Sequence, residues 1–436
     1  MPTTANKTSA FLERHQLGVT NMEALSQRLR PDPSPPASRV PGGARLSPEA
    51  LDKRWALLKA SAEQRAAVAD PQTVAQMELF QSNVENFIGT VKLPVGLAGP
   101  LRVNGLFAKG DFYVPLATTE AALIASYSRG AVTISQAGGC SAMMVSEGVS
   151  RAPGFAFRSL EEAGRFVVWA LGEQDAFKRV AEATTRHGRL TDVRFAIEGN
   201  HVYLTFEFFT GDAAGQNMVT IATQAICNHI SEHTPVQPQY SFLEANFSGD
   251  KKACVLSFQG VRGKKVAAEV TLSPELVKRS LHSTPEMMVK YWRMSAIGGV
   301  MSGTIGVQGH YANGLAALFI ACGQDAACVA ESSVGITRFE LTESGGLYAC
   351  VTLPNLIVGT VGGGTNLPSQ RVCLEILGLG GADHAPAFAE VCAALALAGE
   401  LSIIAALSCD EFTRAHSRRA RGRHTKPETP EAEKQL

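Results

Sequence analysis

Ionisable side chains at four places in the sequence could act as acids, bases or charge stabilisers. Asp325 is the most promising, because residues 311–330 around it are apolar at helical spacing. A carboxylate buried without a partner is costly, so a buried acid tends to mark a functional site. The other three have bland interpretations: Lys251 fits a solvated lysine pair, His416 fits a polar tail, and Glu120 fits the first turn of a helix.

Glycine-rich segments are candidates for binding a phosphate. Residues 359–365, GTVGGGT, lack GxGxxG spacing, and the chain has no GxxxxGK[ST] motif. Alone, the triple glycine fits a tight turn as well as it fits a ligand site. Residues 189–210 alternate apolar and polar positions and predict a β-hairpin, and residues 211–229 predict a helix. A strand, turn and helix in this order can direct backbone amides at a phosphate.

Three further segments predict helices that must position these candidates. Ser47, followed by proline and apolar residues at helical spacing, predicts a helix that ends near Asp70. Residues 118–137 predict a helix of small residues. Val391–Cys409 is the most apolar stretch, and Glu400 lies at its middle, where hydrocarbon would make a charge costly. We therefore expect a buried helix there and no membrane span.

The composition argues against several classes of protein. The 436 residues include 40 basic and 40 acidic ones, so no long-range field would gather nucleic acid or an anionic membrane. The nine cysteines show no metal-ligand spacing, so we expect reduced thiols and no metal. Residues 1–21 are polar without an apolar run, and residues 31–44 are rich in proline and glycine. We expect a disordered leader, a disordered tail after Arg418, and a soluble, cytoplasmic protein.

Several segments together resemble the hydroxymethylglutaryl-CoA reductase family, in that family's order along most of the chain. They are Glu85–Gly89 with Leu93–Gly96, Ala117–Glu120, Gly211–Asn217, Asp250–Lys252, Cys322–Ala327, Val358–Asn366 and a late His416. Any one could occur by chance, but seven in order could not. The DKK and VGTVGGGTN forms are similar to the catalytic portion of the eukaryotic-type class.

The resemblance implies an α/β (α+β) fold, in which a small ferredoxin-like NADP-binding domain is inserted into a larger acyl-CoA-binding domain. It also implies a homodimer, or a tetramer, with active sites at the subunit interface. The expected ranges are 1–45 for a disordered leader and linker, 46–80 for an N-terminal helical segment, 81–145 and 241–408 for the large domain, 146–240 for the inserted domain, and 409–436 for a tail with the histidine.

The implied reaction is reduction of an acyl thioester to an alcohol by NADPH, in two hydride transfers through a hemithioacetal and an aldehyde. By this resemblance, Lys251 stabilises charge on the carbonyl oxygen and His416 protonates the departing thiolate. Glu120 supplies a proton at the second transfer, as a carboxylic acid kept neutral by burial. Asp325 would lie between Lys251 and Glu120, so that the groups titrate as one network.

Two segments are implied to hold the cofactor. The GDAAGQN stretch matches the family's DAMGMN with Ala214 and Gln216 in place of methionines, a change that should leave its backbone role intact. Thr185 and Arg186 lie where the eukaryotic-type enzymes grip the 2′-phosphate, which favours NADPH, although an exposed basic turn is the alternative. The cofactor-binding residues implied are Thr185, Arg186, Asp212, Ala213, Gly215, Gln216, Asn217, Gly362, Gly363 and Thr365.

The acyl pocket departs from the family's pattern at three positions. Met143 and Met294 stand where an arginine and a lysine are expected, and Glu244 stands where a serine is expected. The loss of two cations and the gain of an acid would weaken the binding of a substrate carboxylate. A one-residue shift of the alignment, which brings Arg293 to the position of Met294, would restore one cation. The substrate-binding residues implied are Glu85, Asn86, Arg129, Met143, Glu244, Lys252, Met294 and Asn313.

This altered pocket favours a thioester other than hydroxymethylglutaryl-CoA, carried by CoA or by a carrier protein. Two alternatives stay open. The first is the family's own reaction, which forms mevalonate and has the stronger family prior. The second is a silent paralogue that only binds CoA or nucleotide, and the complete set of Glu120, Lys251, Asp325 and His416 argues against it.

Overall fold

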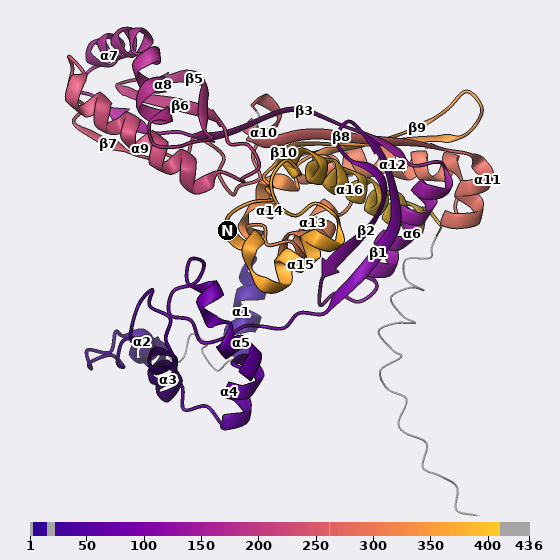
Figure 1. Cartoon of the computed structure of the whole chain (residues 1–436), viewed down its shortest axis with the longest axis horizontal. Helices are drawn as coiled ribbons and strands as arrows, with labels where there is room; N and C mark the ends of the chain where they lie inside the picture. The colour runs from indigo at the N-terminus through magenta and orange to yellow at the C-terminus, as the bar shows by residue number, and fades with distance from the viewer. Residues whose placement is uncertain (1–2, 15–21, 261, 410–436) are drawn as a thin grey trace, which may run out of the picture. The chain divides into compact units, whose positions relative to one another are not determined.

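A computed structural model describes residues 3–14, 22–260 and 262–409 of the chain (Figure 1). The contacts divide the chain into two compact units. The N-terminal unit is Met1–Ala75 with Val84–Gly89, and the main unit is Gln76–Asn83 with Thr90–Leu436. All the strands of the described chain belong to the main unit.

The N-terminal unit is helical. Its helices are α1 (Ala5–Arg14), α2 (Met22–Leu29), α3 (Pro48–Leu57), α4 (Ala62–Val68) and α5 (Pro71–Ala75). The helix predicted from Ser47 begins there, because the Ser47 hydroxyl accepts a hydrogen bond from a backbone N–H of its first turn. It is shorter than predicted. A capping box formed by Ser61 and Gln64 starts a separate helix, so the predicted single helix is two.

Helices α1 and α2 lie in the range 1–45, where the sequence predicted a disordered leader. Both segments are rich in good helix formers such as alanine, leucine, glutamate and arginine, which is enough for local helical structure. No residue of α1 is buried. The prediction is therefore wrong for the secondary structure of these two segments.

A buried arginine holds the N-terminal unit together. Arg54 on α3 is 2% exposed, and its guanidinium donates hydrogen bonds to the backbone carbonyls of Pro41, Gly43, Arg45 and Phe87. The neighbouring Trp55 donates its indole N–H to the Ile88 carbonyl. These bonds fasten the Glu85–Gly89 segment, one of the family-like motifs, to α3.

The main unit is built on ten described strands. They are β1 (Val95–Gly105), β2 (Lys109–Ala117), β3 (Cys140–Arg151), β4 (Gly154–Ala156), β5 (Arg189–Glu198), β6 (His201–Phe209), β7 (Tyr240–Phe242), β8 (Gly263–Leu272), β9 (Ile336–Leu341) and β10 (Leu347–Leu356). The helices used below are α6 (Leu123–Gln136), α7 (Leu160–Gly172), α8 (Gln174–Glu182), α9 (Gln216–His233), α10 (Leu256–Gln259), α12 (Pro285–Ser302), α13 (Tyr311–Ala321), α14 (Val329–Ser332), α15 (Pro368–Ile376) and α16 (Ala385–Ser408).

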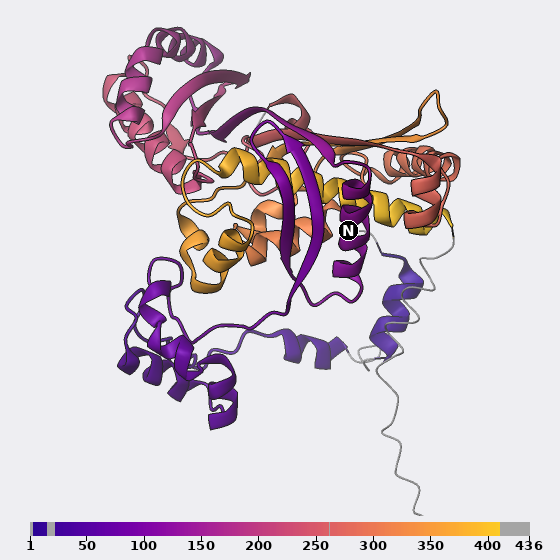
Figure 2. The ribbon, with the colours of Figure 1, turned by 45° about the vertical axis from the view of Figure 1, so that its right-hand side comes forward.

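One hydrophobic core lies between a sheet and three helices. The sheet has the strand order β2-β1-β3-β8-β10-β9, and α6, α13 and α16 contribute most of the helical residues of this core. Figure 2 shows α16, in yellow, running behind β1 and β2. Strand β3 continues beyond this sheet: Ser141–Gly148 pair with β8, and Val149–Arg151 pair with β6. Arg151 therefore stands where the chain passes from one sheet to the next.

A second hydrophobic core joins residues between Val149 and Val236. Here β4, α7 and α8, β5, β6, α9 and β7 follow one another, and the strand order is β7-β4-β6-β5. This is the ferredoxin-like arrangement that the resemblance implied. The predicted hairpin over residues 189–210 is β5 and β6, and the predicted helix is α9. The exact domain boundaries stay a prediction.

Helix α16 is the buried helix predicted from the apolar stretch near residue 400. By length and composition alone it could cross a membrane, but 83% of its most apolar window is buried inside the protein. Its two glutamates are fully buried and bonded to backbone amides. Glu390 accepts from the β1–β2 turn, including Phe107 and Ala108, and Glu400 accepts from Gly309 and His310.

Candidate active site

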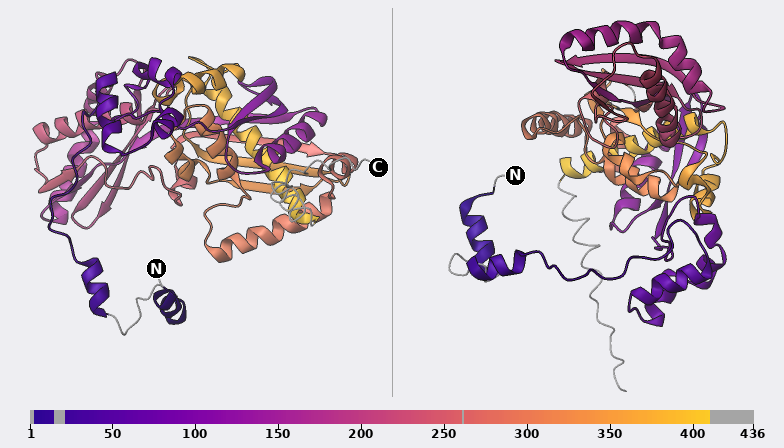
Figure 3. Two further views of the ribbon diagram at one scale, coloured as in Figure 1. Left: turned by 90° about the horizontal axis from the view of Figure 1, so that it is seen from below. Right: turned by 90° about the vertical axis from the view of Figure 1, so that its left-hand side faces the viewer.

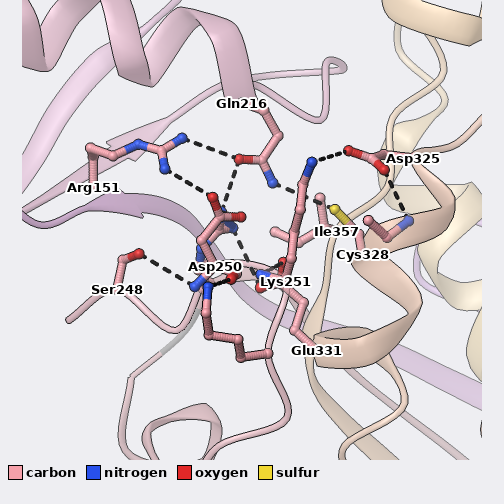
Figure 4. Close-up of polar contacts among 12 residues, drawn as sticks. Arg151, Gln216, Ser248, Asp250, Lys251, Asp325, Cys328, Glu331 and Ile357 are labelled. Carbon is pink, nitrogen blue, oxygen red and sulfur yellow. Dashed lines mark hydrogen bonds and ion pairs between the residues drawn. The ribbon is translucent and has the colours of Figure 1, made fainter. Parts of the chain in front are cut away.

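Lys251 and Asp325 form an ion pair, with 2.8 Å between Lys251 Nζ and Asp325 Oδ2 (Figure 4). Lys251 lies in the loop between β7 and α10. The hydrogen bond to Asp325 raises the pKa of Lys251, so the ammonium stays charged at neutral pH. Asp325 also accepts a hydrogen bond from the Ala327 N–H and so caps the short 3-10 helix Ala326–Cys328.

Asp325 differs from its prediction in two respects. It lies outside a helix, because α13 ends at Ala321 and Gly323 adopts a φ of +67°. A side chain at Gly323 would also collide with the carbonyl of Gly364, so the chain must turn here. The Asp325 side chain is 40% exposed, with Lys251 as its partner. It is therefore a paired, accessible carboxylate, and the expectation of a buried one is wrong.

Four charged residues that the sequence analysis did not single out surround this pair. Asp250 accepts a hydrogen bond from Arg151 at 2.9 Å and pairs with Arg262. Arg262 in turn lies 3.4 Å from Glu331. Arg151, Arg262 and Glu331 are all buried. Burial alone would raise the pKa of Asp250, but the two guanidinium groups lower it. With Gln216, Lys251 and Asp325, these four residues are called the Lys251 cluster below.

Two residues predicted for other roles belong to this cluster or contact it. Gln216, predicted as a cofactor residue, accepts a hydrogen bond from Arg262 at 2.9 Å and donates to the Cys328 thiol at 3.6 Å. Glu244 accepts from the Ser248 hydroxyl at 3.0 Å and lies 3.4 Å from Arg151. The negative charge of Glu244 therefore faces a buried guanidinium, which the sequence analysis did not foresee.

Glu120 lies in a different region of the main unit. It follows β2, its N–H donates to the Thr118 hydroxyl, and its carboxylate accepts a hydrogen bond from Asn313 on α13 at 2.8 Å. A cavity of about 300 Å³ adjoins it. The residues that define this Glu120 pocket are Glu120, Ser126, Tyr127, His310, Asn313 and Leu407. Glu120 is exposed in the described chain, whereas a buried carboxylic acid was expected.

His310 is a member of the Glu120 pocket that sequence reasoning missed. Its ring stacks on Tyr127 with 5.2 Å between centroids, and its Nδ1 lies 3.2 Å from the Tyr127 hydroxyl. Burial lowers the pKa of His310 to about 4, so the imidazole is neutral at physiological pH. Its carbonyl also accepts a hydrogen bond from that hydroxyl. The pocket thus has a rigid, uncharged wall on this side.

The predicted cofactor segments lie together at the start of α9. Asp212 accepts backbone hydrogen bonds through its carbonyl from Thr360 at 2.8 Å, and through its carboxylate from Asp383 at 2.8 Å. A Cβ at Gly359 would come within 2.5 Å of the Ala214 nitrogen, so this glycine allows the two loops to touch. Gly362 and Gly363 have positive φ angles and face open space. Such an exposed turn suits a nucleotide.

The other predicted cofactor residues occupy two further positions. The Thr185 hydroxyl accepts from the Gly188 N–H at 3.1 Å and lies 3.0 Å from the sulfur of Met218 in the first turn of α9. Arg186 is exposed beside it, and Asn217 is exposed at the start of α9. Three residues make the local turns: Ala213 bridges to Val361, Gly215 begins α9 at φ +78°, and Thr365 bonds to the Gly362 carbonyl.

The predicted acyl residues belong to several elements and to both units. Met143 on β3 is 51% exposed and Met294 on α12 is 77% exposed. Arg129 bonds to Ser402 on α16, and Lys252 donates to the Asp250 carbonyl at 2.7 Å. Glu85 and Asn86 belong to the N-terminal unit. The altered acyl pocket therefore stays a prediction.

The predicted catalytic His416 lies outside the described residues, so its role stays a prediction. Within residues 3–14, 22–260 and 262–409, no group of three or more histidine, cysteine, aspartate or glutamate side chains is arranged to hold a metal ion. The nine cysteines are all unpaired thiols, and Cys328 is the one that contacts the Lys251 cluster through Gln216.

Sequence and structure comparisons agree on one family. The profile described as hydroxymethylglutaryl-coenzyme A reductase matches residues 50–421. Proteins named 3-hydroxy-3-methylglutaryl-coenzyme A reductase are 43% identical over 347 residues in Pyrococcus horikoshii, covering 78% of this chain and 84% of the relative. In Aeropyrum pernix the identity is 44% over 351 residues, covering 79% and 83%. The class II enzyme of Streptococcus pneumoniae, solved with NADPH bound, shares the fold at a TM-score of 0.61 and 20% identity, covering 80% of this chain and 98% of that chain.

The fold and the clustered motifs define an α/β oxidoreductase. The chain belongs to the hydroxymethylglutaryl-coenzyme A reductase family. Membership confirms the resemblance, the fold class, and an NADPH-dependent oxidoreductase that acts on a CoA thioester. It does not support the predicted change of substrate, because the relatives carry the name of the family's own reaction.

Proposed function

We propose that this protein reduces hydroxymethylglutaryl-CoA to mevalonate with two equivalents of NADPH. The observation that carries the proposal is the Lys251–Asp325 pair, 2.8 Å apart, set beside the buried guanidinium of Arg151. A fixed ammonium can stabilise the oxyanion formed when a thioester carbonyl is reduced. The Arg151 guanidinium already pairs with Asp250 and Glu244, so it fixes the loop that carries Lys251. Both features suit the reduction of a thioester carbonyl, and the relatives named 3-hydroxy-3-methylglutaryl-coenzyme A reductase support that acyl group.

Different residues stabilise charge and donate protons during the reaction. Lys251 faces the reacting oxygen and Asp325 keeps its ammonium charged and oriented. Glu120, held by Asn313, supplies a proton to the aldehyde oxygen at the second reduction. His416 protonates the departing CoA thiolate, a role that rests on the sequence motif alone. Carbonyl reduction proceeds through a hemithioacetal and an aldehyde.

Residues at the start of α9 suit NADPH, which supplies the hydride when bound. Gly362 and Gly363 leave an open turn. The first N–H groups of a helix such as α9 have no partner within the helix, so the helix N-terminus favours an anion. Arg186, exposed next to Thr185, would take the 2′-phosphate that distinguishes NADPH from NADH. Arg186→Ala should therefore raise KM for NADPH and leave KM for NADH nearly unchanged.

We further propose that the protein works as a homodimer. Helix α12, drawn in salmon in Figure 3, exposes large apolar side chains. These are Met287, Met294, Ile297, Val300 and Met301, between 45% and 83% exposed. An apolar row of this kind favours association with another surface. Sedimentation equilibrium of the full chain tests the proposal, and Ile297→Glu should shift the protein toward monomer.

The substrate is tested by following NADPH oxidation with hydroxymethylglutaryl-CoA and identifying the product by mass spectrometry. Turnover with two NADPH consumed per mevalonate supports the proposal. A panel of other acyl-CoA and carrier-bound thioesters serves as the comparison. If one of them is turned over and hydroxymethylglutaryl-CoA is not, the proposed substrate is wrong and the altered-pocket hypothesis returns.

A further inference from the structure

A fully buried glutamate lies directly behind Lys251. Glu331, on the short helix α14, has no exposed surface. One carboxylate oxygen accepts a hydrogen bond from the Lys251 backbone N–H at 3.0 Å, and the other lies 3.4 Å from Arg262 (Figure 4). Glu331 therefore contacts the backbone of the lysine whose side chain faces the substrate.

The backbone of Lys251 needs such a partner. Its φ of +57° lies in the left-handed region, which a residue with a side chain rarely adopts. Gly249, two residues earlier, also has a positive φ, so the chain makes a sharp turn here. Unfavourable backbone conformations persist only where surrounding contacts hold them. The bond from the Lys251 N–H to Glu331 is such a contact, and it orients the residue so that Nζ meets Asp325.

Glu331 can accept this bond in either protonation state. Burial raises the pKa of Glu331 to about 7, although the nearby Arg262 opposes the shift. The other ionisable groups that face it are Asp250, Lys251 and the Cys328 thiol. A neutral carboxylic acid still has a carbonyl oxygen that accepts a hydrogen bond. The bond to Lys251 therefore does not require a charge on Glu331.

We propose that Glu331 is a positioning residue for the reduction: its buried carboxyl group holds the Lys251 backbone so that the ammonium meets both Asp325 and the thioester oxygen. The inference rests on the proposed role of Lys251. Glu331 acts through Lys251 and touches neither substrate nor cofactor. Its loss should lower kcat and leave the binding of NADPH unchanged.

The test compares Glu331→Ala, Glu331→Gln and Ser332→Ala in the full-length protein. Glutamine keeps an acceptor for the Lys251 N–H and alanine removes it. Ser332 is an equally buried neighbour whose hydroxyl accepts from the Ile357 N–H, so its variant controls for the general loss of a buried hydrogen bond. Glu331→Ala should lower kcat about hundredfold with KM for NADPH unchanged, because small misplacements of a catalytic group have effects of that size. Glu331→Gln should recover most of kcat, and Ser332→Ala should retain it.

Amide hydrogen exchange of residues 249–254 gives a readout that does not need turnover. Glu331→Ala should speed exchange in this segment, while Glu331→Gln and Ser332→Ala should leave it unchanged. If the wild-type protein reduced no hydroxymethylglutaryl-CoA, the proposed function would fail, and the exchange result would still decide whether Glu331 holds Lys251. Unchanged exchange in Glu331→Ala, or equal loss of kcat in the alanine and glutamine variants, would overturn the inference.

Discussion

The Lys251 cluster and the Glu120 pocket carry out neighbouring parts of one proposed reaction, but they are built differently. In the Lys251 cluster, buried arginines and carboxylates pair with one another, so the position of each charge is fixed by its partners. In the Glu120 pocket, the acid is exposed, and its neighbours are the Asn313 amide and the neutral His310 ring. The first region is organised before substrate arrives, and the second leaves room for it.

The largest expected effect is on the Lys251 cluster. Lys251→Met removes the ammonium and keeps an unbranched side chain as far as Cε, so it should lower kcat about a thousandfold, as loss of an oxyanion stabiliser does. NADPH binding, followed by fluorescence titration, should stay within error of the wild type. Lys109→Met, which changes an exposed lysine on β2 that is given no role in the reaction, is the matched control. If the Lys251 variant turned over at the wild-type rate, the central assignment would be wrong.

Glu120→Gln should have a smaller effect, about a hundredfold in kcat, because general acids typically contribute factors of that size. The loss should appear in the reduction of the aldehyde supplied directly, and single-turnover measurements can separate the two reductions. A variant that lost only the first reduction would contradict the proposed role. Glu120→Asp serves as the comparison, since it keeps the acid but shortens its reach.

The His310 wall of the Glu120 pocket should make stability depend on pH. Because the folded pKa of about 4 lies below the ordinary 6.5, the unfolded chain binds the proton more readily. The free energy of unfolding is therefore not reduced by His310 above pH 6.5. It falls as the pH drops toward 4, by about 2 kcal/mol at pH 5. Urea unfolding at pH 7.5 and pH 5 should therefore show a larger loss for the wild type than for His310→Phe. Equal losses would show that His310 does not titrate as inferred.

Asn313→Ala should give the smallest effect, a loss of about tenfold or less in kcat. It removes one hydrogen bond to an exposed carboxylate, where water competes, and a net contribution of about 0.5–1.5 kcal/mol corresponds to roughly tenfold or less. Asn313→Asp sharpens the comparison, since a second carboxylate beside Glu120 should shift the pH profile of kcat as well as its height. If neither variant changed kcat or its pH profile, Asn313 would not orient Glu120 during the reaction.

Patterns along the chain predicted the fold better than they predicted the site. The hairpin over residues 189–210 and the buried helix α16 each follow from local periodicity, and the ordered motifs identified the family. The Lys251–Asp325 pair also followed from those motifs. Arg151 and Glu331 could not be found in this way, because nothing in their own segments shows that tertiary pairing buries them beside Lys251.

Arg54 sets a limit on how far the chain can be shortened. The predicted leader ends at residue 45, yet three of the four carbonyls that accept hydrogen bonds from the Arg54 guanidinium belong to residues 41, 43 and 45. A protein trimmed to residue 46 would leave the buried Arg54 guanidinium with the Phe87 carbonyl alone of these four acceptors, and the Asn86 N–H would lose the Gly43 carbonyl. The apparent linker is thus part of the fold, and the functional amino-terminal boundary lies before Pro41.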